Sequence, residues 1–171
     1  MPKTKIILDA DVIIHFSKGE KLSILPQIFP QYDFVLLDVV HRELKGEIKH
    51  QIDNQIGILK NISLLSFNPV SEERKEYALL TKTRGRGESA CLVYCRYNND
   101  VIGSSNLKDI ADYCQMYGIT YLTTFDFLHF AVKKELISNV EANEFIQQVQ
   151  KKGSKLPHIN DFSEFISEVI L

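Results

Sequence analysis

The amino-acid sequence predicts an α/β fold in which helices cover both faces of a mainly parallel β-sheet. Three observations support this prediction. Short apolar runs recur along the chain, segments with helical patterns separate them, and glycine, proline or capping residues mark most of the boundaries. Strands that alternate with helices in this way form parallel sheets that are buried on both faces.

Five short apolar runs are the predicted strands. The first run, Ile6 to Leu8, is followed directly by a pair of carboxylates, and Pro69 lies just after the third run. Runs of this length suit strands that are buried on both faces of a sheet. In chain order, the predicted strands occupy residues 6–8, 34–37, 62–67, 101–103 and 119–122.

The helices in the first part of the chain are predicted from their end signals and their apolar spacing. Gly19, Pro30 and Gly46 lie where the first three helices end. The fourth helix places an isoleucine or leucine on one face at each turn. These helices are predicted over residues 12–18, 22–29, 39–44 and 48–59.

The helices in the second part of the chain begin after a basic, glycine-containing loop or at capping residues. The loop spans residues 82–87. Two capping boxes, Ser138 with Glu141 and Asp161 with Glu164, begin the last two helices. The remaining helices are predicted over residues 71–82, 88–97, 106–117 and 124–135.

Length and composition favour one cytoplasmic domain over residues 1–171. The hydrophobic content of 44% is enough for a real core, and the net charge of −2 does not by itself indicate a nucleic-acid-binding protein. Asp9, Asp11 and His15 interrupt the first apolar run, so we expect no signal peptide. We also expect no membrane span, because no apolar stretch is long enough to cross a bilayer. The chain has an odd number of cysteines, so we expect reduced thiols that pack in the core: Cys91, Cys95 and Cys114.

Oxygen-bearing side chains follow several of the predicted strands. Asp9 ends the first strand, Glu43 lies in the helix after the second, Glu88 begins the helix before the fourth, and residues 104–106 follow the fourth. All four segments are expected at the carboxyl edge of the parallel sheet, where α/β proteins bind ligands. Carboxylates gathered there need a counter-charge, and a divalent cation with oxygen ligands is the usual one.

The sequence resembles the PIN-domain nucleases over nearly its whole length. The third acidic block is similar to that of a subgroup with a Gly-Glu-Ser or Gly-Glu-Ala signature, and the resemblance places Asp9, Glu43 and Glu88 on the first three acids of the family. The matching segments are LDADVII, DVVHREL, GRGESACLVY, VIGSSNLKDIADYC and GITYLTTFDFLHFAVKKELIS.

This resemblance implies a three-layer α/β/α fold with a five-stranded parallel sheet in the order 3-2-1-4-5. It also implies hydrolysis of RNA that depends on Mg²⁺ or Mn²⁺. Many bacterial members of the family are toxins of toxin–antitoxin pairs. The partners to consider are therefore RNA, an antitoxin protein and a second copy of the chain in a homodimer.

The sequence departs from the family at the fourth acidic position. The family usually has Thr-x-Asp there, whereas this chain has Ser104, Ser105 and Asn106. Asn106 still offers a carbonyl oxygen to a metal but brings no charge, and Asp109 lies one helical turn further on. An alternative is that Asn106 and Asp109 only cap the helix that follows.

Phosphodiester hydrolysis needs a nucleophilic water, charge neutralisation and in-line geometry, and a metal held by carboxylates can supply all three. We expect Asp9, Glu43, Glu88 and Asn106 to hold Mg²⁺ or Mn²⁺, directly or through water. Asp109 joins the three acids as an expected catalytic residue. Because several acids lie close together, their pKa values should be raised when no metal is bound.

Two further acids each leave two roles open. Asp11 follows Asp9 by two residues and could orient a water molecule, or it could cap the first helix. Asp126 lies in the helix after the fifth strand and could join the site, or it could interact with the positive end of that helix.

Basic side chains near these acids are the candidates for contacts with RNA. Arg84 and Arg86 precede Glu88 and could hold phosphates beside the cut, or they could belong to a solvated loop. His41 and His129 have the chemistry of general bases, but we expect both to be packing residues.

Two other functions are consistent with parts of this pattern. The Asp9-Ala10-Asp11 segment resembles the start of haloacid-dehalogenase-type phosphatases, in which the first Asp is a covalent nucleophile. That alternative leaves the Gly-Glu-Ser block without a role. The second alternative is a PIN fold with a weakened metal site that binds RNA or a protein, which the asparagine at position 106 favours.

Overall fold

A five-stranded, all-parallel sheet forms the centre of the computed structural model, which describes residues 3–171. The strand order is β3-β2-β1-β4-β5, so the order that the resemblance implies is confirmed. Ile7 of the central strand is in register with Val35 on one side and Ile102 on the other. The strands are β1 (Lys5–Leu8), β2 (Asp33–Leu37), β3 (Ser63–Leu65), β4 (Val101–Gly103) and β5 (Tyr121–Leu122).

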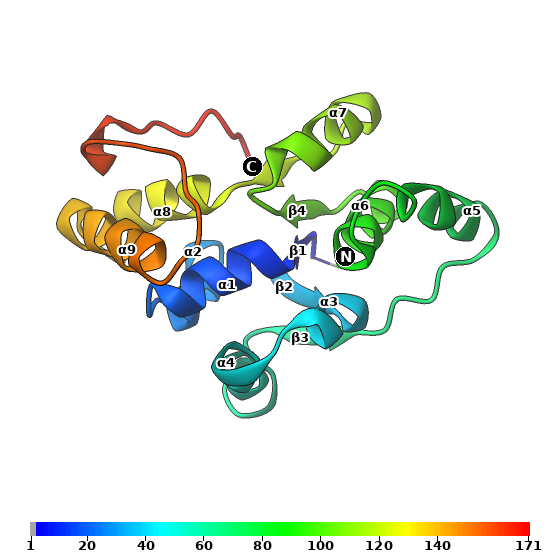
Figure 1. The fold of residues 1–171 in the computed structure, drawn as a ribbon, viewed down its shortest axis with the longest axis horizontal. Coiled ribbons are helices and arrows are strands. Elements are labelled where there is room, and N and C mark those ends of the chain that lie inside the picture. Colours follow the sequence, from blue (N-terminus) through cyan, green and yellow to red (C-terminus); the bar gives the residue numbers. More distant parts are fainter. Residues whose placement is uncertain (1–2) are drawn as a thin grey trace.

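Helices cover both faces of the sheet and give the fold its three layers (Figure 1). Helices α1, α8 and α9 pack together on one side, and α5, α6 and α7 pack together on the other. No helix within residues 3–171 is long and apolar enough to cross a membrane. The helices are α1 (Ala10–Lys18), α2 (Leu25–Ile28), α3 (Asp38–Glu43), α4 (Gly46–Gly57), α5 (Ser71–Leu80), α6 (Arg86–Asn98), α7 (Leu107–Tyr117), α8 (Thr124–Lys133) and α9 (Asn139–Lys151).

Strand β1 lies in the middle of the hydrophobic core. Its residues Ile6, Ile7 and Leu8 are fully buried. The ring of Phe16 in α1 meets the ring of Phe127 in α8 edge to face, with centroids 6.0 Å apart. Each fully buried side chain of this size contributes about 1.5–3 kcal/mol to folding. This apolar packing stabilises a fold that must also hold charged side chains at the end of β1.

The carboxyl ends of three neighbouring strands meet at one edge of the sheet. The backbone N–H of Asp9 donates to the carbonyl of Gly103 at 2.9 Å, and the N–H of Ser104 donates to the carbonyl of Leu122 at 3.0 Å. Gly103 has no side chain, and a Cβ there would lie 3.2 Å from atoms of Leu8 and of a core phenylalanine. The residues that follow β1, β4 and β5 are therefore brought close together.

The segment predicted as one helix over residues 22–29 is divided into two. A 3₁₀ turn, η1, spans Leu22–Ile24, and α2 follows it at Leu25–Ile28. Pro26 explains the division, because proline has no N–H and is tolerated in the first turn of a helix but not in its interior.

The prediction of a last helix beginning at Asp161 is wrong. The Asp161 side chain accepts a hydrogen bond from the N–H of Ser163, but only a 3₁₀ turn, η2 (Phe162–Glu164), follows. The rings of Phe162 and Phe165 both meet the ring of Phe125 in α8, at centroid distances of 5.5 and 5.3 Å. Packing against α8 holds Phe165 in an extended conformation, so the helix does not continue.

Candidate active site

Asp9 lies between the end of β1 and the start of α1. Its Oδ1 accepts a hydrogen bond from the N–H of Ala10 at 2.8 Å, and its Oδ2 accepts one from the Ser104 hydroxyl at 3.1 Å. Burial, followed by the nearby charge of Asp11, raises the pKa of Asp9 to about 8. The carboxyl group therefore lies where its charged form is costly unless a cation approaches.

Asp11 binds backbone amides on two different segments. Its Oδ1 accepts from the N–H of Val12 at 2.6 Å, and its Oδ2 accepts from the N–H of Ser105 at 2.8 Å. Burial raises the pKa of Asp11 despite these hydrogen bonds. The N-cap of α1 is Asp9, and Asp11 lies in the first turn of the helix, so the prediction that Asp11 caps the helix is wrong. Its contact with Ser105 joins α1 to the loop after β4.

Asn106 connects two acids through its side-chain amide. Its Nδ2 donates to Glu88 Oε1 and to Asp109 Oδ2, both at 2.8 Å. Asn106 precedes α7 at the N-cap position, but its side chain makes no capping hydrogen bond. The alternative in which the Asn106 side chain only caps the helix therefore does not describe this structure.

Glu88 is the buried acid of the two that accept hydrogen bonds from Asn106. It lies in the first turn of α6, which begins at Arg86 rather than at Glu88. Burial raises the pKa of Glu88 to about 7, and the charges of Asp109 and Asp11 act in the same direction. The charge of Glu88 also acts on Asp9, so these acids form one electrostatic cluster.

Glu43 reaches the same region from the last residue of α3. Its Oε1 accepts a hydrogen bond at 2.8 Å from the N–H of Gly87, the residue before Glu88. A Cβ at Gly87 would lie only 2.6 Å from Glu43 Oε2. The absence of a side chain at Gly87 therefore allows Glu43 to approach α6. This role of Gly87 was not predicted, although a glycine directly before Glu88 in GRGES was a usable signal.

The two arginines of the predicted RNA contact differ in their surroundings. Arg84 is partly buried, and its Nε donates at 2.7 Å to the backbone carbonyl of Asp109. Its charge also lies close enough to lower the pKa of Glu88. Arg86 is exposed at the start of α6. Arg84 thus flanks the acid cluster, and Arg86 remains free to contact a ligand from solvent.

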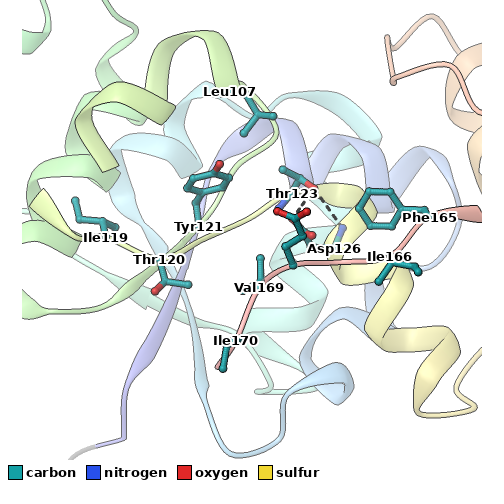
Figure 2. Close-up of a pocket in the computed structure, with 11 residues that line it drawn as sticks. Leu107, Ile119, Thr120, Tyr121, Thr123, Asp126, Phe165, Ile166, Val169 and Ile170 are labelled. Carbon is teal, nitrogen blue, oxygen red and sulfur yellow. Dashed lines mark hydrogen bonds between the residues drawn. The ribbon is translucent and has the colours of Figure 1, made fainter. Parts of the chain in front are cut away.

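Asp126 belongs to a different local structure. Together with Thr123 it forms the capping box of α8, and it also accepts a hydrogen bond from the Ser167 hydroxyl at 2.6 Å. Figure 2 shows Asp126 beside Thr123, next to Phe165 and Ile166 of the C-terminal segment. These contacts agree with the alternative in which Asp126 serves the end of the helix.

His41 and His129 make structural contacts, in agreement with the packing role expected of them. His41 Nε2 lies 2.6 Å from Asp53 Oδ1, which links α3 to α4. His129 Nδ1 donates to the backbone carbonyl of Phe165 at 3.2 Å, and its ring packs near Phe130. The three cysteines are buried and free, as expected.

A hydrogen-bond chain that joins α1, α8 and the loop after β4 was not predicted. The Ser105 hydroxyl donates to Thr124 Oγ1 at 2.8 Å, and Thr124 Oγ1 is hydrogen-bonded to His15 Nδ1 at the same distance. Burial lowers the pKa of His15 to about 4, so this ring is neutral near pH 7. The chain connects α1 and α8 to the loop that carries Asn106.

The acid cluster can be compared with what a divalent cation requires. In the part of the chain that the structure describes, no three Asp, Glu, His or Cys side chains form a ready metal site. Mg²⁺, however, keeps several waters and is commonly held by only one or two carboxylates. None of the salt bridges among residues 3–171 involves Asp9, Asp11 or Glu88. These oxygen donors are buried or half-buried and form no salt bridge, so they fit a hydrated hard cation.

Comparison with known proteins identifies the family but no individual relative. Among curated proteins, none matches the chain significantly. A family model described as a PIN domain matches residues 5–160, which includes β1 to β5 and all the acids of the cluster. PIN domains have a nuclease-type fold, which agrees with the observed strand order. On this evidence the chain belongs to the PIN-domain family.

Proposed function

We propose that this protein is a metal-dependent endoribonuclease that cuts RNA by hydrolysis. One observation carries the proposal: Asp9 and Glu88 are buried in one electrostatic cluster, and both have raised pKa values. Buried acids with raised pKa values are typical of functional sites, because catalysis and metal binding use groups whose charge is costly in a low-dielectric environment. Membership of the PIN-domain family supports nuclease chemistry for this cluster.

The residues that would hold Mg²⁺ or Mn²⁺ are Asp9, Glu43, Glu88 and Asn106. When bound, the ion lowers the pKa of a water molecule and neutralises charge on the phosphate. Asn106 can bind an ion only through Oδ1, whereas its Nδ2 faces the carboxylates of Glu88 and Asp109. An ion on the side of Glu88 and Asp109 would therefore require the side-chain amide to flip, so that Oδ1 takes the place of Nδ2.

The other residues of the site position the ligands and the substrate. Asp109 fixes Asn106 through its carboxylate and fixes Arg84 through its backbone carbonyl. We assign Asp109 as the fourth acid of the catalytic set on this basis. The guanidinium groups of Arg84 and Arg86 are the proposed contacts for phosphates beside the cut, since arginine binds phosphate with paired donors.

The phosphatase alternative requires Asp9 to attack phosphorus with a carboxylate oxygen. Both oxygens of Asp9 accept hydrogen bonds, from Ala10 and from Ser104. The family match is also to a PIN domain, so the phosphatase alternative is not carried further. The binding-module alternative differs from the proposed nuclease only in the strength of the metal site, and it is an outcome of the experiments below. Binding of an antitoxin protein and formation of a homodimer remain predictions.

Cleavage of RNA by an Asp9→Asn variant tests the proposal. We expect wild-type protein to cut a labelled single-stranded RNA in Mn²⁺ but not in EDTA, and we expect Asp9→Asn to be inactive. Asp112→Asn is the matched control, because Asp112 is exposed on α7 and the chemical change is identical. Circular dichroism shows whether each variant is folded. Cleavage by folded Asp9→Asn at the wild-type rate would remove Asp9 from the mechanism.

A further inference from the structure

A mainly apolar pocket of about 260 Å³ adjoins the acid cluster. This volume is slightly below the range of about 300–1,000 Å³ that is typical for drug-sized ligands, so it suits a smaller group. The segment after α9 folds back along α8 and forms part of the wall (Figure 1). The residues that matter for its chemistry are Ser105, Phe125, Leu156, Pro157, His158 and Phe165.

Ser105 joins this pocket to the acids. It lines the pocket, and its backbone N–H donates to Asp11 Oδ2 at 2.8 Å. The next residue, Asn106, donates to Glu88 and Asp109. Ser105 is therefore in contact with both the pocket and the acid cluster.

The aromatic wall of the pocket is held in place by several contacts. The rings of Phe125 and Phe165 have centroids 5.3 Å apart at an interplanar angle of 80°. Phe165 also lies 5.6 Å from Phe162, and its carbonyl accepts a hydrogen bond from His129. Flat aromatic ligands, nucleobases among them, bind well against such rings.

The hydroxyl groups in the wall already form hydrogen bonds within the protein. The Ser105 and Thr124 hydroxyls form a hydrogen bond, and the Thr123 hydroxyl donates to Asp126. A ligand in this pocket therefore gains contact mainly with ring faces and aliphatic groups. Such a site favours stacking over recognition of hydrogen-bonding edges.

A positively charged side chain also contacts the acid cluster. Arg84 Nε donates to the backbone carbonyl of Asp109, whose carboxylate accepts a hydrogen bond from Asn106. The acid cluster is thus in contact with a positive side chain through Asp109 and with the aromatic pocket through Ser105. A single-stranded nucleic acid carries groups that suit both features: its phosphates suit the positive side chain, and its bases suit the aromatic pocket.

We propose that this pocket holds one unstacked nucleobase of the RNA, next to the phosphate that is cut. The inference depends on the proposed ribonuclease function, because the base is defined by its place beside the cut. Stacking on one aromatic group is worth about 1–3 kcal/mol per base, which corresponds to about 5- to 150-fold in affinity.

The test measures binding of RNA in EDTA, so that it does not depend on cleavage. The probes are a fluorescein-labelled single-stranded RNA and versions in which each position in turn carries an abasic ribose. One abasic position, beside the site of cutting mapped in Mn²⁺, should weaken binding to wild-type protein by about 5- to 150-fold. Phe165→Ala should weaken binding of intact RNA by a similar factor and should abolish the penalty of that abasic position.

Two further variants keep the result interpretable. Ile166→Ala is the matched control, because Ile166 lies in the same segment but lines the neighbouring pocket shown in Figure 2. His158→Ala changes an exposed wall residue and should reduce binding of intact RNA without affecting the fold. If Phe165→Ala and His158→Ala both bind RNA as Ile166→Ala does, the pocket holds no base and the inference is overturned.

Other outcomes separate this inference from the proposed function. If Phe165→Ala weakens intact and abasic RNA equally at every position, the ring acts through packing of the C-terminal segment, and the inference is again overturned. If wild-type protein cuts RNA but no abasic position matters, only the inference fails. If wild-type protein neither binds nor cuts RNA, the ribonuclease proposal itself fails.

Discussion

Replacing Asn106 by aspartate should change the stability of the metal-free protein and its metal affinity in opposite directions. The Asn106 amide donates one hydrogen bond to Glu88 and one to Asp109. A carboxylate cannot donate either bond, and it adds a negative charge beside two others. If Asn106 were only a helix cap, stability would change little, because Asp caps helices nearly as well as Asn.

The size of the stability change follows from the two lost hydrogen bonds. A hydrogen bond to a charged group contributes about 1.5–3 kcal/mol, and partial exposure of the site favours the lower value. We therefore expect Asn106→Asp to lower the free energy of unfolding by about 3 kcal/mol in EDTA at pH 8. Asn106→Ala removes the same bonds without adding charge, so it should cost less.

The same substitution, Asn106→Asp, should increase the affinity for Mn²⁺. An added carboxylate ligand should strengthen Mn²⁺ binding by about 1–2 kcal/mol, which is about five- to thirtyfold in affinity. Urea denaturation in EDTA measures the first effect, and calorimetric titration with Mn²⁺ measures the second. Asp109→Asn shows in the same titration whether the neighbouring acid contributes. If Asn106→Asp leaves both the free energy of unfolding and the Mn²⁺ affinity at wild-type values, neither the two hydrogen bonds of Asn106 nor its place at the metal site matters as described.

Two further substitutions test contacts around the site. Gly87→Ala places a Cβ 2.6 Å from Glu43, so it should displace that carboxylate, cost about 1 kcal/mol of stability through loss of its hydrogen bond to the Gly87 N–H and reduce RNA cleavage. Gly85→Ala is its control, because a Cβ there meets nothing within 4 Å, and equal cleavage by the two variants would contradict the role of Gly87. Burial lowers the pKa of His15 to about 4 in the folded protein, so the unfolded chain is protonated at this residue at a higher pH than the folded protein. The free energy of unfolding should therefore fall as pH decreases from about 6.5 through about 4. The loss attributable to His15 is at most about 3 kcal/mol, and His15→Gln should flatten this part of the pH dependence of urea denaturation.

Local patterns were enough to predict most of the elements and the position of several acids. The apolar run before Asp9 predicted a buried strand that ends at a carboxylate, and β1 ends at Leu8. The capping box of Ser138 with Glu141 was also confirmed. The strand order, by contrast, came from the family resemblance, because periodicity does not determine which strands are neighbours.

Contacts between distant segments could not be predicted from local patterns. Glu43 and Gly87 are 44 residues apart, and their contact depends on how α3 packs against α6. The hydrogen bond between His15 and Thr124 likewise depends on the packing of α1 against α8. The capping residues at Asp161 predicted a helix, but the contacts of Phe165 with α8 determine the conformation there.

The proposed function requires the acids around Asp9 to bind a divalent cation. Calorimetric titration of Mn²⁺ into wild-type protein and into Asp9→Asn measures this binding. We predict saturable binding to the wild-type protein and a loss of about tenfold or more in affinity for the variant, since one charged ligand is worth more than 1.4 kcal/mol at a partly buried site. Wild-type protein that binds no Mn²⁺ at millimolar concentration, or a folded Asp9→Asn variant that binds Mn²⁺ equally well, would contradict this proposal.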